Sequence, residues 1–360
     1  MTLLTFNVIK VLGISSIASI TAILWAPFLI NFLYKHKLWK KTARTKAISG
    51  EDAVIFNALH KERETKVPRL GGLLIWMTVV FVSFLFFILS VIFDGDFSKL
   101  NFLSRSQTWL PLFTLISASL VGLLDDILVI KPTKIFGITW VGKYIGGGIS
   151  FKKRLVSIFL IGLVGALWFY YKLGWNVITV PLLGQFEIGF WYVPIFIFVM
   201  IACWSGGVID GLDGLSGGSF ASIFGAFAVI AFSQGKVDLA TFCMVITGTL
   251  FAFLWFNIPP ARFYMSETGS LGLTATISVV AFLTDSVIVL PIIAGLLVLE
   301  SGSVIVQLLS KKFRKKKIFL STPIHHHFEA IGWPAYKVTM RAWIVGIVLA
   351  ILGVAIRLLG

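Results

Sequence analysis

Long runs of apolar residues dominate the chain and set its predicted architecture. A helix needs about 20 apolar residues to cross a lipid bilayer, and ten runs come close to or exceed that length. The apolar residues follow one another instead of alternating with polar ones, so a closed transmembrane barrel is not expected. The pattern predicts an all-α integral membrane protein with about ten transmembrane helices, over residues 8–34, 71–93, 108–129, 155–171, 192–209, 216–233, 238–257, 270–284, 286–309 and 342–359.

The segments between these runs are not suited to form a soluble domain. The longest polar stretch, 35–69, is too short and too charged to bury a core of its own, and no internal repeat is evident. We therefore expect one multi-span transmembrane domain over residues 1–360. Segment 176–190 differs from the other connections, because its residues alternate around a glycine turn, and it predicts a short external β-hairpin.

Composition supports the membrane assignment. The 360 residues are 58% hydrophobic and 13% charged, whereas about a quarter of the residues of a soluble protein are charged. Cys203 and Cys243 both lie in apolar runs, so no disulfide framework is expected. The first run is too long for a cleaved signal peptide and lacks a small-residue cleavage site, so it predicts a retained first helix.

The net charge of +15 is concentrated in three loops. In a membrane protein such an excess marks cytoplasmic loops rather than nucleic-acid binding. Loops 35–69, 131–154 and 310–341 are basic, and the third contains KKFRKKK, which we interpret as a topology signal that also attracts lipid head groups. Loops 94–107 and 172–191 are not enriched in basic residues. The positive-inside rule therefore predicts cytoplasmic basic loops and, with ten helices, both termini outside.

Carboxylates stand where a membrane protein rarely places them. Asp125 and Asp126 close one apolar run, and Asp210 and Asp213 close another in the sequence IDGLDGL. Carboxylates inside or at the edge of a membrane are costly and usually functional. In the predicted topology, polar groups distant in sequence meet at one membrane face and predict a site; besides these four aspartates they are Asn257, Glu267, His325, His326 and His327.

The residue types favour chemistry on a phosphate group. Magnesium prefers hard oxygen ligands, usually one or two carboxylates completed by water and substrate phosphate. Two adjacent aspartates can divide metal binding and base or orienting roles, and the i, i+3 spacing of Asp210 and Asp213 would put both on one face of a helical turn. Phosphoryl transfer requires neutralisation of charge on the transferring oxygens. Suitable cationic groups are Lys152, Lys153, Arg154 and the three histidines.

Each motif also has a purely structural interpretation. The Asp125–Asp126 pair can be a polar helix end among lipid head groups, and IDGLDGL can be a capping turn between two helices. The three histidines can form a solvated loop or an adventitious metal site. Asn257 can be an interfacial residue without a part in catalysis.

Taken together, the motifs resemble those of the phospho-N-acetylmuramoyl-pentapeptide transferase family, a branch of the polyprenyl-phosphate N-acetylhexosamine-1-phosphate transferases. The aspartate pair and DGLDGL are shared across the superfamily, whereas PIHHHFEAIGW and the following MRAW point to this branch. The resemblance covers nearly the whole chain; its other anchors are PRLGG, LLDDI, GISFKKR, FLWFN and SETGS.

The resemblance implies an enzyme of peptidoglycan biosynthesis in the bacterial cytoplasmic (inner) membrane, with its active site on the cytoplasmic face. It implies Mg²⁺-dependent transfer of phospho-MurNAc-pentapeptide from UDP-MurNAc-pentapeptide to undecaprenyl phosphate, which gives lipid I and UMP. It also implies roles in cell wall biogenesis, cell shape and cell division. Homodimerisation would fit the family, although the sequence carries no interface signal.

Carried over by position, the resemblance implies specific roles. Asp125 is the expected base or orienting group for the lipid phosphate, and Asp126 a metal or phosphate-network ligand. Asp210 belongs to the catalytic and metal network, and Glu267 stands at a metal-ligand position. The expected substrate-binding residues are Asp213, Asn257, Arg154, Lys152, His325, His326 and His327.

Three positions depart from the family pattern. Glu267 stands where the family usually has an aspartate, which keeps the carboxylate but adds a methylene. The residues at 204–207, Trp-Ser-Gly-Gly, replace a segment that usually carries asparagines, so amide donors to the substrate are missing. Arg154 aligns with a lysine, which keeps the charge but changes the geometry. We interpret the chain as a divergent member of the branch.

Two other functions fit parts of the sequence. A sister-branch transferase would move another HexNAc-1-phosphate to the lipid carrier, and a secondary transporter would place polar groups near the bilayer midplane between inverted repeats. The acids cluster at one face, with Glu300 as the main deep exception, and this disfavours transport. Glu300 has no role that the sequence assigns.

Overall fold

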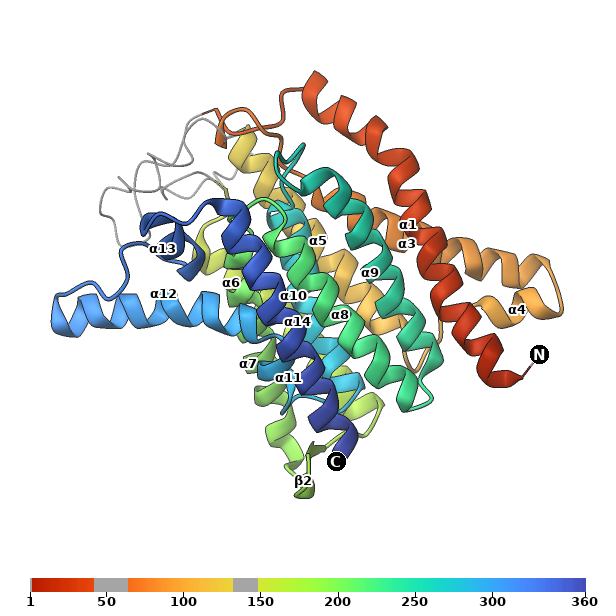
Figure 1. The fold of residues 1–360 in the computed structure, drawn as a ribbon. Coiled ribbons are helices and arrows are strands. Elements are labelled where there is room, and N and C mark those ends of the chain that lie inside the picture. The colour runs from red at the N-terminus through yellow and green to blue at the C-terminus, as the bar shows by residue number, and fades with distance from the viewer. Residues whose placement is uncertain (1, 42–63, 132–147) are drawn as a thin grey trace.

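The computed structural model describes residues 2–41, 64–131 and 148–360, and they form a bundle of long helices (Figure 1). The parts of the predicted basic loops at 42–63 and 132–147 lie outside the described residues. Within the described residues, nine helical segments are long and apolar enough to cross a membrane. They are built from α1 (Leu3–Lys35), α3 (Gly72–Ile92), α5 (Trp109–Ile130), α6 (Phe151–Leu167) with η1 (Trp168–Lys172), α7 (Tyr192–Ser205) with η2 (Gly189–Trp191) and η3 (Gly206–Ile209), α8 (Leu215–Ser233), α9 (Val237–Asn257), α10 (Ser266–Leu283) and α14 (Ala335–Leu359).

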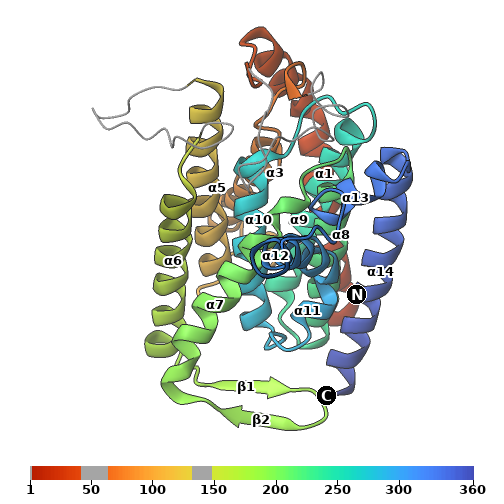
Figure 2. The ribbon, with the colours of Figure 1, turned by 90° about the vertical axis from the view of Figure 1, so that its left-hand side faces the viewer.

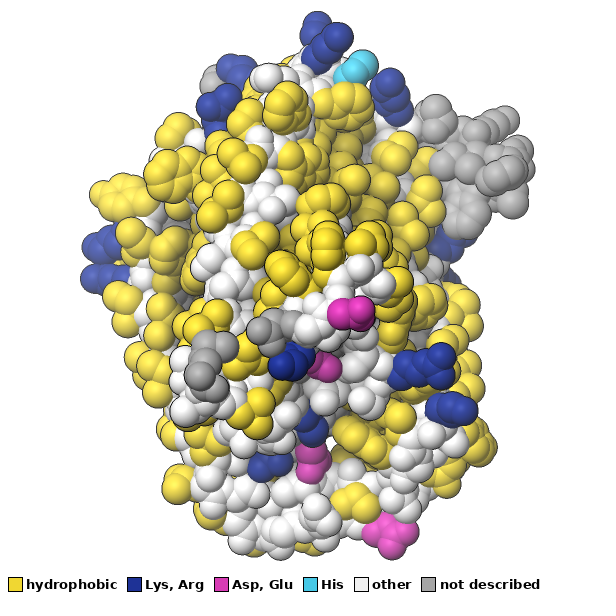
Figure 3. Space-filling view, turned by 90° about the vertical axis from the view of Figure 1, so that its right-hand side faces the viewer, with side chains coloured by type: hydrophobic (Ala, Val, Ile, Leu, Met, Phe, Trp, Pro, Cys, Tyr) yellow, Lys and Arg dark blue, Asp and Glu magenta, His cyan; other side chains and the backbone are white. Residues whose placement is uncertain are grey.

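Helix α10 forms the centre of the bundle, and apolar side chains cover the outside. All residues of α10 except Glu267 are buried. On outer helices, large apolar side chains are exposed, such as Phe28, which is 75% exposed, and Ile351, which is 64% exposed. Figure 3 shows one face of the molecule, with apolar side chains over much of its surface and charged side chains of both signs at its edges and in its lower half. Exposed apolar surface of this extent is unfavourable in water and fits a lipid environment. The chain is an all-α multi-pass membrane protein.

The prediction of a tenth uninterrupted span at 286–309 was wrong. This region contains a turn, the short helix α11 (Leu290–Ile293) and the separate helix α12 (Gly295–Arg314). Helix α12 lies across the direction of the other helices, and Figure 2 looks along its axis. Its sequence explains this placement, because Glu300, Gln307 and three basic residues in the last turn break the apolar run. Helix α13 (Ile324–Ala330) follows and leads to α14.

The predicted hairpin at 176–190 is confirmed. Strand β1 (Val177–Val180) pairs with β2 (Gly184–Glu187) in antiparallel register, with Val177 opposite Glu187. Gly184, the first residue of β2 after the turn, has φ 96°, a conformation that glycine adopts without steric cost. The remaining short helix in the described residues is α4 (Asp96–Leu100), which follows α3.

The helices alternate in direction, so particular ends meet on each side of the bundle. Helices α5 and α9 end on one side, where α6, α8 and α10 begin, and the chain returns there through α11–α13 (Figures 1 and 2). The C-terminus lies beside the hairpin on the opposite side, and α1 starts toward that side. The two termini therefore share a side, as predicted from the sequence, and their position outside the cell stays a prediction.

Candidate active site

The carboxylate of Asp126 is held in place by two distant parts of the chain. Its Oδ1 accepts hydrogen bonds from Nε and Nη2 of Arg69 at 3.0 and 2.8 Å, and Arg69 lies just before α3. Its Oδ2 accepts from the backbone N–H and the hydroxyl of Thr268 at 2.9 and 2.6 Å. Asp126 is fully buried. Because both oxygens have strong donors, Asp126 fastens the end of α5 to the beginning of α10.

Asp125 faces a second group of polar side chains. Its Oδ1 accepts from the backbone N–H of Ile149 at 2.5 Å, and its Oδ2 lies 3.8 Å from Nη1 of Arg154. The same Nη1 donates to Oε1 of Glu267 at 2.6 Å. Arg154 therefore bridges two carboxylates, one from α5 and one from α10. Its Nε is buried without a hydrogen-bond partner, so this guanidinium retains a donor for a further acceptor.

Close approach of α5 and α10 makes this arrangement possible. Gly122 lies one helical turn before Asp126, and a Cβ atom at Gly122 would overlap the backbone carbonyl of Glu267. The absence of a side chain lets the two backbones come into contact. Asp126 thereby reaches the first turn of α10, where backbone N–H groups have no partner within the helix.

Asp210 is the second carboxylate at the start of α10. Its Oδ2 accepts from the backbone N–H of Ser266, and its Oδ1 accepts from the hydroxyl of Ser216, both at 2.7 Å. Burial raises the pKa of Asp210 above its ordinary value, although these two hydrogen bonds oppose the shift. Asp126 and Asp210 together satisfy N–H groups that no side chain of α10 itself caps.

The expectation that Asp210 and Asp213 share one face of a helical turn was wrong. Residues 210–214 form a non-helical turn between η3 and α8. Oδ2 of Asp213 instead accepts from the backbone N–H of Ala261 at 3.1 Å, in the connection from α9 to α10. Gly214 has φ 79°, a left-handed conformation that a right-handed helix does not contain, so the turn at this residue is not helical. The two carboxylates therefore support different segments around the same site.

Asn257 braces this turn from the last residue of α9. Its Oδ1 accepts from the backbone N–H of Gly214 at 2.9 Å, and its Nδ2 donates to the carbonyl of Phe263 at 2.7 Å. The side chain is 1% exposed. The two contacts use both the acceptor and the donor of the amide and give Asn257 a structural role. Its predicted role in positioning the substrate stays a prediction.

The three histidines lie together on α13 but have different partners. Nδ1 of His325 lies 2.8 Å from Oε2 of Glu300, and Nδ1 of His326 lies 2.7 Å from Oε2 of Glu329. Nδ1 of His327 accepts from the backbone N–H of Leu320 at 3.3 Å. The rings therefore do not converge as a metal site. Of the three, His325 comes closest to the turn at residues 210–214 (the aspartate turn), because its ring packs against Gly211.

Gly211 offers a direct test of that contact. A Cβ atom at this position would overlap the imidazole of His325, which is 1% exposed and held by Glu300. We expect Gly211→Ala to displace the imidazole and to lower turnover by roughly tenfold or more, the scale of one lost polar contact to a charged group. Gly225→Ala is the matched control, because the added methyl group would meet no neighbour within 4 Å. Equal turnover of the two variants would contradict the packing described here.

The remaining predicted side chains lie on the rim of the site. Lys152 is exposed on the first turn of α6, one residue before Lys153 and two before Arg154. Among the described residues, no three His, Cys, Asp or Glu side chains converge closely enough to hold a metal ion by themselves. The carboxylate oxygens of Asp125, Glu267 and Asp210 are nevertheless hard donors. One or two of them, with substrate phosphate, are the usual ligands of magnesium.

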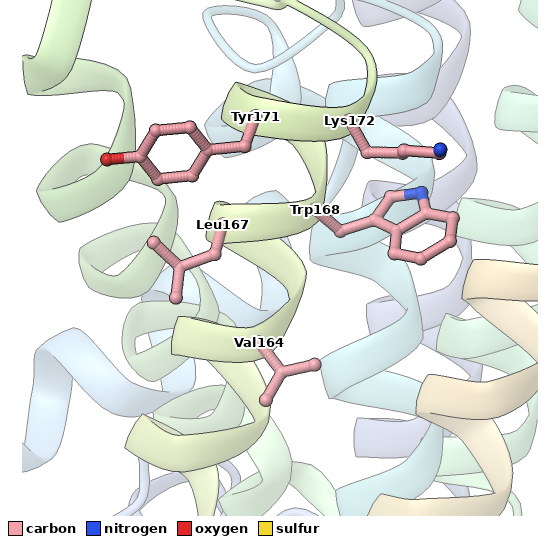
Figure 4. Close-up of a pocket in the computed structure, with 5 residues that line it drawn as sticks. All are labelled: Val164, Leu167, Trp168, Tyr171 and Lys172. Carbon is pink, nitrogen blue, oxygen red and sulfur yellow. The ribbon is translucent and has the colours of Figure 1, made fainter.

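A shallow hollow on the surface of the bundle lies away from this chemistry. Figure 4 shows its lining, which comes from the second half of α6 and from η1. It contains apolar and aromatic side chains with one lysine and no carboxylate: Val164, Leu167, Trp168, Tyr171 and Lys172. The hollow lies at the end of α6 opposite Arg154, so it is separate from the candidate active site.

Comparison with known proteins identifies the family. A profile of glycosyl transferase family 4 matches residues 108–285, which include both aspartate motifs and Glu267. The phospho-N-acetylmuramoyl-pentapeptide-transferase of Geobacillus sp. strain WCH70 is 34% identical over 300 residues, which cover 82% of this chain and 85% of the relative. The chain belongs to this transferase family. The protein of the same name from Anoxybacillus flavithermus is 31% identical over 349 residues, 96% of this chain and 98% of the relative.

Membership of the family makes the protein a transferase and gives the polar cluster a catalytic context. Sequence reasoning found Asp125, Asp126, Asp210, Arg154 and Glu267, which the structure brings together. It did not assign roles to Arg69 or Thr268, which hold Asp126. Both residues lie in anchors of the resemblance, Arg69 in PRLGG and Thr268 in SETGS, but neither motif indicates that its residue pairs with Asp126.

Proposed function

We propose that the protein transfers phospho-MurNAc-pentapeptide from UDP-MurNAc-pentapeptide to undecaprenyl phosphate, with lipid I and UMP as products. The observation that carries this proposal is the bridge from Asp125 through Arg154 to Glu267. It places a cation with an unused buried donor between two carboxylates, at helix ends near the basic segments. Such a site can bind and orient phosphate groups.

The proposed reaction exchanges one phosphorus–oxygen bond for another. An oxygen of undecaprenyl phosphate attacks the β-phosphorus of the nucleotide sugar, and the bond from that phosphorus to the bridging oxygen breaks. The bridging oxygen leaves with UMP, and the sugar phosphate stays on the lipid. Asp125 orients the attacking phosphate and takes its proton where one is present, and Arg154 stabilises charge on the transferring oxygens.

Magnesium fits the hard oxygen donors of the site. Glu267 and Asp210 are the residues that would hold it. Asp126, the third ligand expected from the resemblance, already accepts two hydrogen bonds on each oxygen and would reach the ion only through water. Asp125 shares Arg154 with Glu267. When bound, Mg²⁺ neutralises negative charge on the phosphates of the donor. We further propose that the site faces the cytoplasm of a bacterial inner membrane, because the positive-inside rule assigns the basic segments to that side.

Release of UMP by detergent-purified protein tests the proposal. UDP-MurNAc-pentapeptide and undecaprenyl phosphate should give UMP and a lipid-linked sugar when Mg²⁺ is present, and neither when it is chelated. Product with UDP-GlcNAc but not with the muramoyl donor would assign the protein to a sister-branch transferase. Absence of product with every nucleotide sugar would refute transferase activity of this chain.

Glu267→Asp tests the metal assignment separately. The shorter side chain withdraws the carboxylate from Arg154 and from a bound cation, so the Mg²⁺ concentration for half-maximal turnover should rise by about tenfold. The control is Glu187→Asp, which makes the same change on strand β2 at the other side of the bundle. An unchanged Mg²⁺ requirement in Glu267→Asp would remove Glu267 from the metal ligands.

A further inference from the structure

Glu300 is a buried acid to which the proposed reaction gives no role. It lies on α12 and is 4% exposed, and its carboxylate contacts the imidazole of His325 on α13. A buried carboxylate is costly unless a partner compensates it. The crosswise orientation of α12 brings Glu300 to this position, since the helix passes beneath α13 in Figure 1.

The contact with Glu300 decides which ring nitrogen of His325 remains available. A carboxylate accepts hydrogen bonds and has no hydrogen to donate, so Nδ1 of His325 must carry the hydrogen of the 2.8 Å contact. Nε2 then points to the opposite side of the ring. It is buried without any hydrogen-bond partner in the structure.

Nε2 of His325 lies next to the aspartate turn. A Cβ atom added to Gly211 would meet Nε2 of His325 first, ahead of the other ring atoms. Gly211 directly follows Asp210, whose oxygens face the beginning of α10. A buried polar atom without a partner is rare in a folded protein and calls for a specific explanation.

We propose that Glu300 is a positioning residue, which holds His325 through Nδ1 so that Nε2 contacts the diphosphate of the bound nucleotide sugar above the Asp210–Gly211 turn. This inference rests on the proposed function and extends it to one residue outside the cluster of carboxylates. Glu300 does not touch the substrate and acts only through the imidazole. The bound nucleotide sugar supplies the missing partner of Nε2.

Gln307 provides a structural comparison on the same helix. It lies two turns after Glu300, and its side chain binds the backbone of Ile318 and Phe319 in the segment that precedes α13. Gln307 therefore supports the position of α13 without touching His325. Replacement of Gln307 should lower thermal stability, and its effect on nucleotide-sugar affinity should not depend on the residue at position 325.

A double-mutant cycle on the full-length protein separates positioning from general support. Affinity for UDP-MurNAc-pentapeptide is measured by calorimetry, and KM and kcat are measured in parallel. Glu300→Met removes the acceptor for Nδ1 while filling similar space. Glu300→Met and His325→Asn should each weaken binding by about tenfold and raise KM more than they lower kcat. The double variant should also weaken binding by about tenfold, because both changes remove the same contact. A hundredfold loss in the double variant, or full affinity of Glu300→Met, would overturn the proposal.

One further variant, His325→Gln, identifies the contacting atom and tests the proposal even if Glu300→Met folds poorly. Asparagine at position 325 places its amide near the Nδ1 position, whereas glutamine reaches toward the Nε2 position. His325→Gln should therefore bind the nucleotide sugar about fivefold or more tightly than His325→Asn; equal affinities would refute a contact through Nε2. The activity of the wild-type protein separates the two proposals. If the wild type releases UMP and the losses of affinity in the two single variants add up in the double variant, only the role of Glu300 is rejected. If the wild type makes no product, the proposed function itself is rejected.

Discussion

Asp125→Asn should lower turnover by at least about 100-fold while the protein stays folded, which is the usual scale for loss of one acid–base or charge-stabilising group. Asparagine has the size of aspartate and keeps an oxygen that can accept from the N–H of Ile149. It removes the negative charge that faces Arg154 and the ability to take a proton. UMP release and the thermal unfolding midpoint in detergent measure the two effects separately.

The matched control is Asp285→Asn. Asp285 also accepts a backbone N–H, from Thr179 at 3.1 Å, but it lies at the other end of α10, next to the hairpin. We expect its turnover to stay within about twofold of the wild type, because it has no contact with the candidate site. Turnover of Asp125→Asn close to that of Asp285→Asn would remove Asp125 from the catalytic residues.

Arg69→Met should destabilise the protein by about 3–5 kcal/mol and abolish most activity, the range measured when one partner of a buried ion pair is removed. Asp126 is fully buried, and Arg69 supplies both donors to its Oδ1. Methionine fills similar space but leaves this carboxylate with the donors of Thr268 alone. Arg105→Met at an exposed position is the control and should leave unfolding nearly unchanged.

A second substitution tests the electrostatic cause of that loss. In Arg69→Met/Asp126→Asn the uncompensated charge is gone, so the unfolding midpoint should recover toward the wild type. Activity should remain low, because the link between α5 and α10 no longer holds the carboxylates of the site in position. A double variant that is less stable than Arg69→Met would contradict this explanation.

The sequence was sufficient to predict the membrane architecture, because hydrophobic length is a local property. The predicted span 71–93 corresponds to α3 at Gly72–Ile92, and the hairpin formed where alternation predicted it. The prediction of a span at 286–309 was wrong because it rested on the number of apolar residues and gave no weight to the buried carboxylate of Glu300. Their number suggested a crossing, whereas the buried acid pairs with His325 and belongs to a helix that lies across the bundle.

The sequence also indicated which residues gather, but it did not indicate how they pair. Asp125 and Asp126 are adjacent and look equivalent in sequence, yet Asp126 faces Arg69 and Thr268, and Asp125 faces Ile149 and Arg154. These partners come from elements up to 142 residues away, so no local pattern encodes them. Asn257 is similar, because only the folded chain shows that its amide spans Gly214 and Phe263.

The most direct test of the proposed phospho-sugar transfer follows the β-phosphorus of the nucleotide sugar. Purified protein is incubated with UDP-MurNAc-pentapeptide labelled with ³²P at the β-phosphate, together with undecaprenyl phosphate and Mg²⁺, and the lipid is then extracted into butanol. Transfer of a phospho-sugar predicts that the label moves into the lipid and that the released UMP is unlabelled. Label that remains in the aqueous phase, or sugar that reaches the lipid without the β-phosphate, would contradict the proposed function.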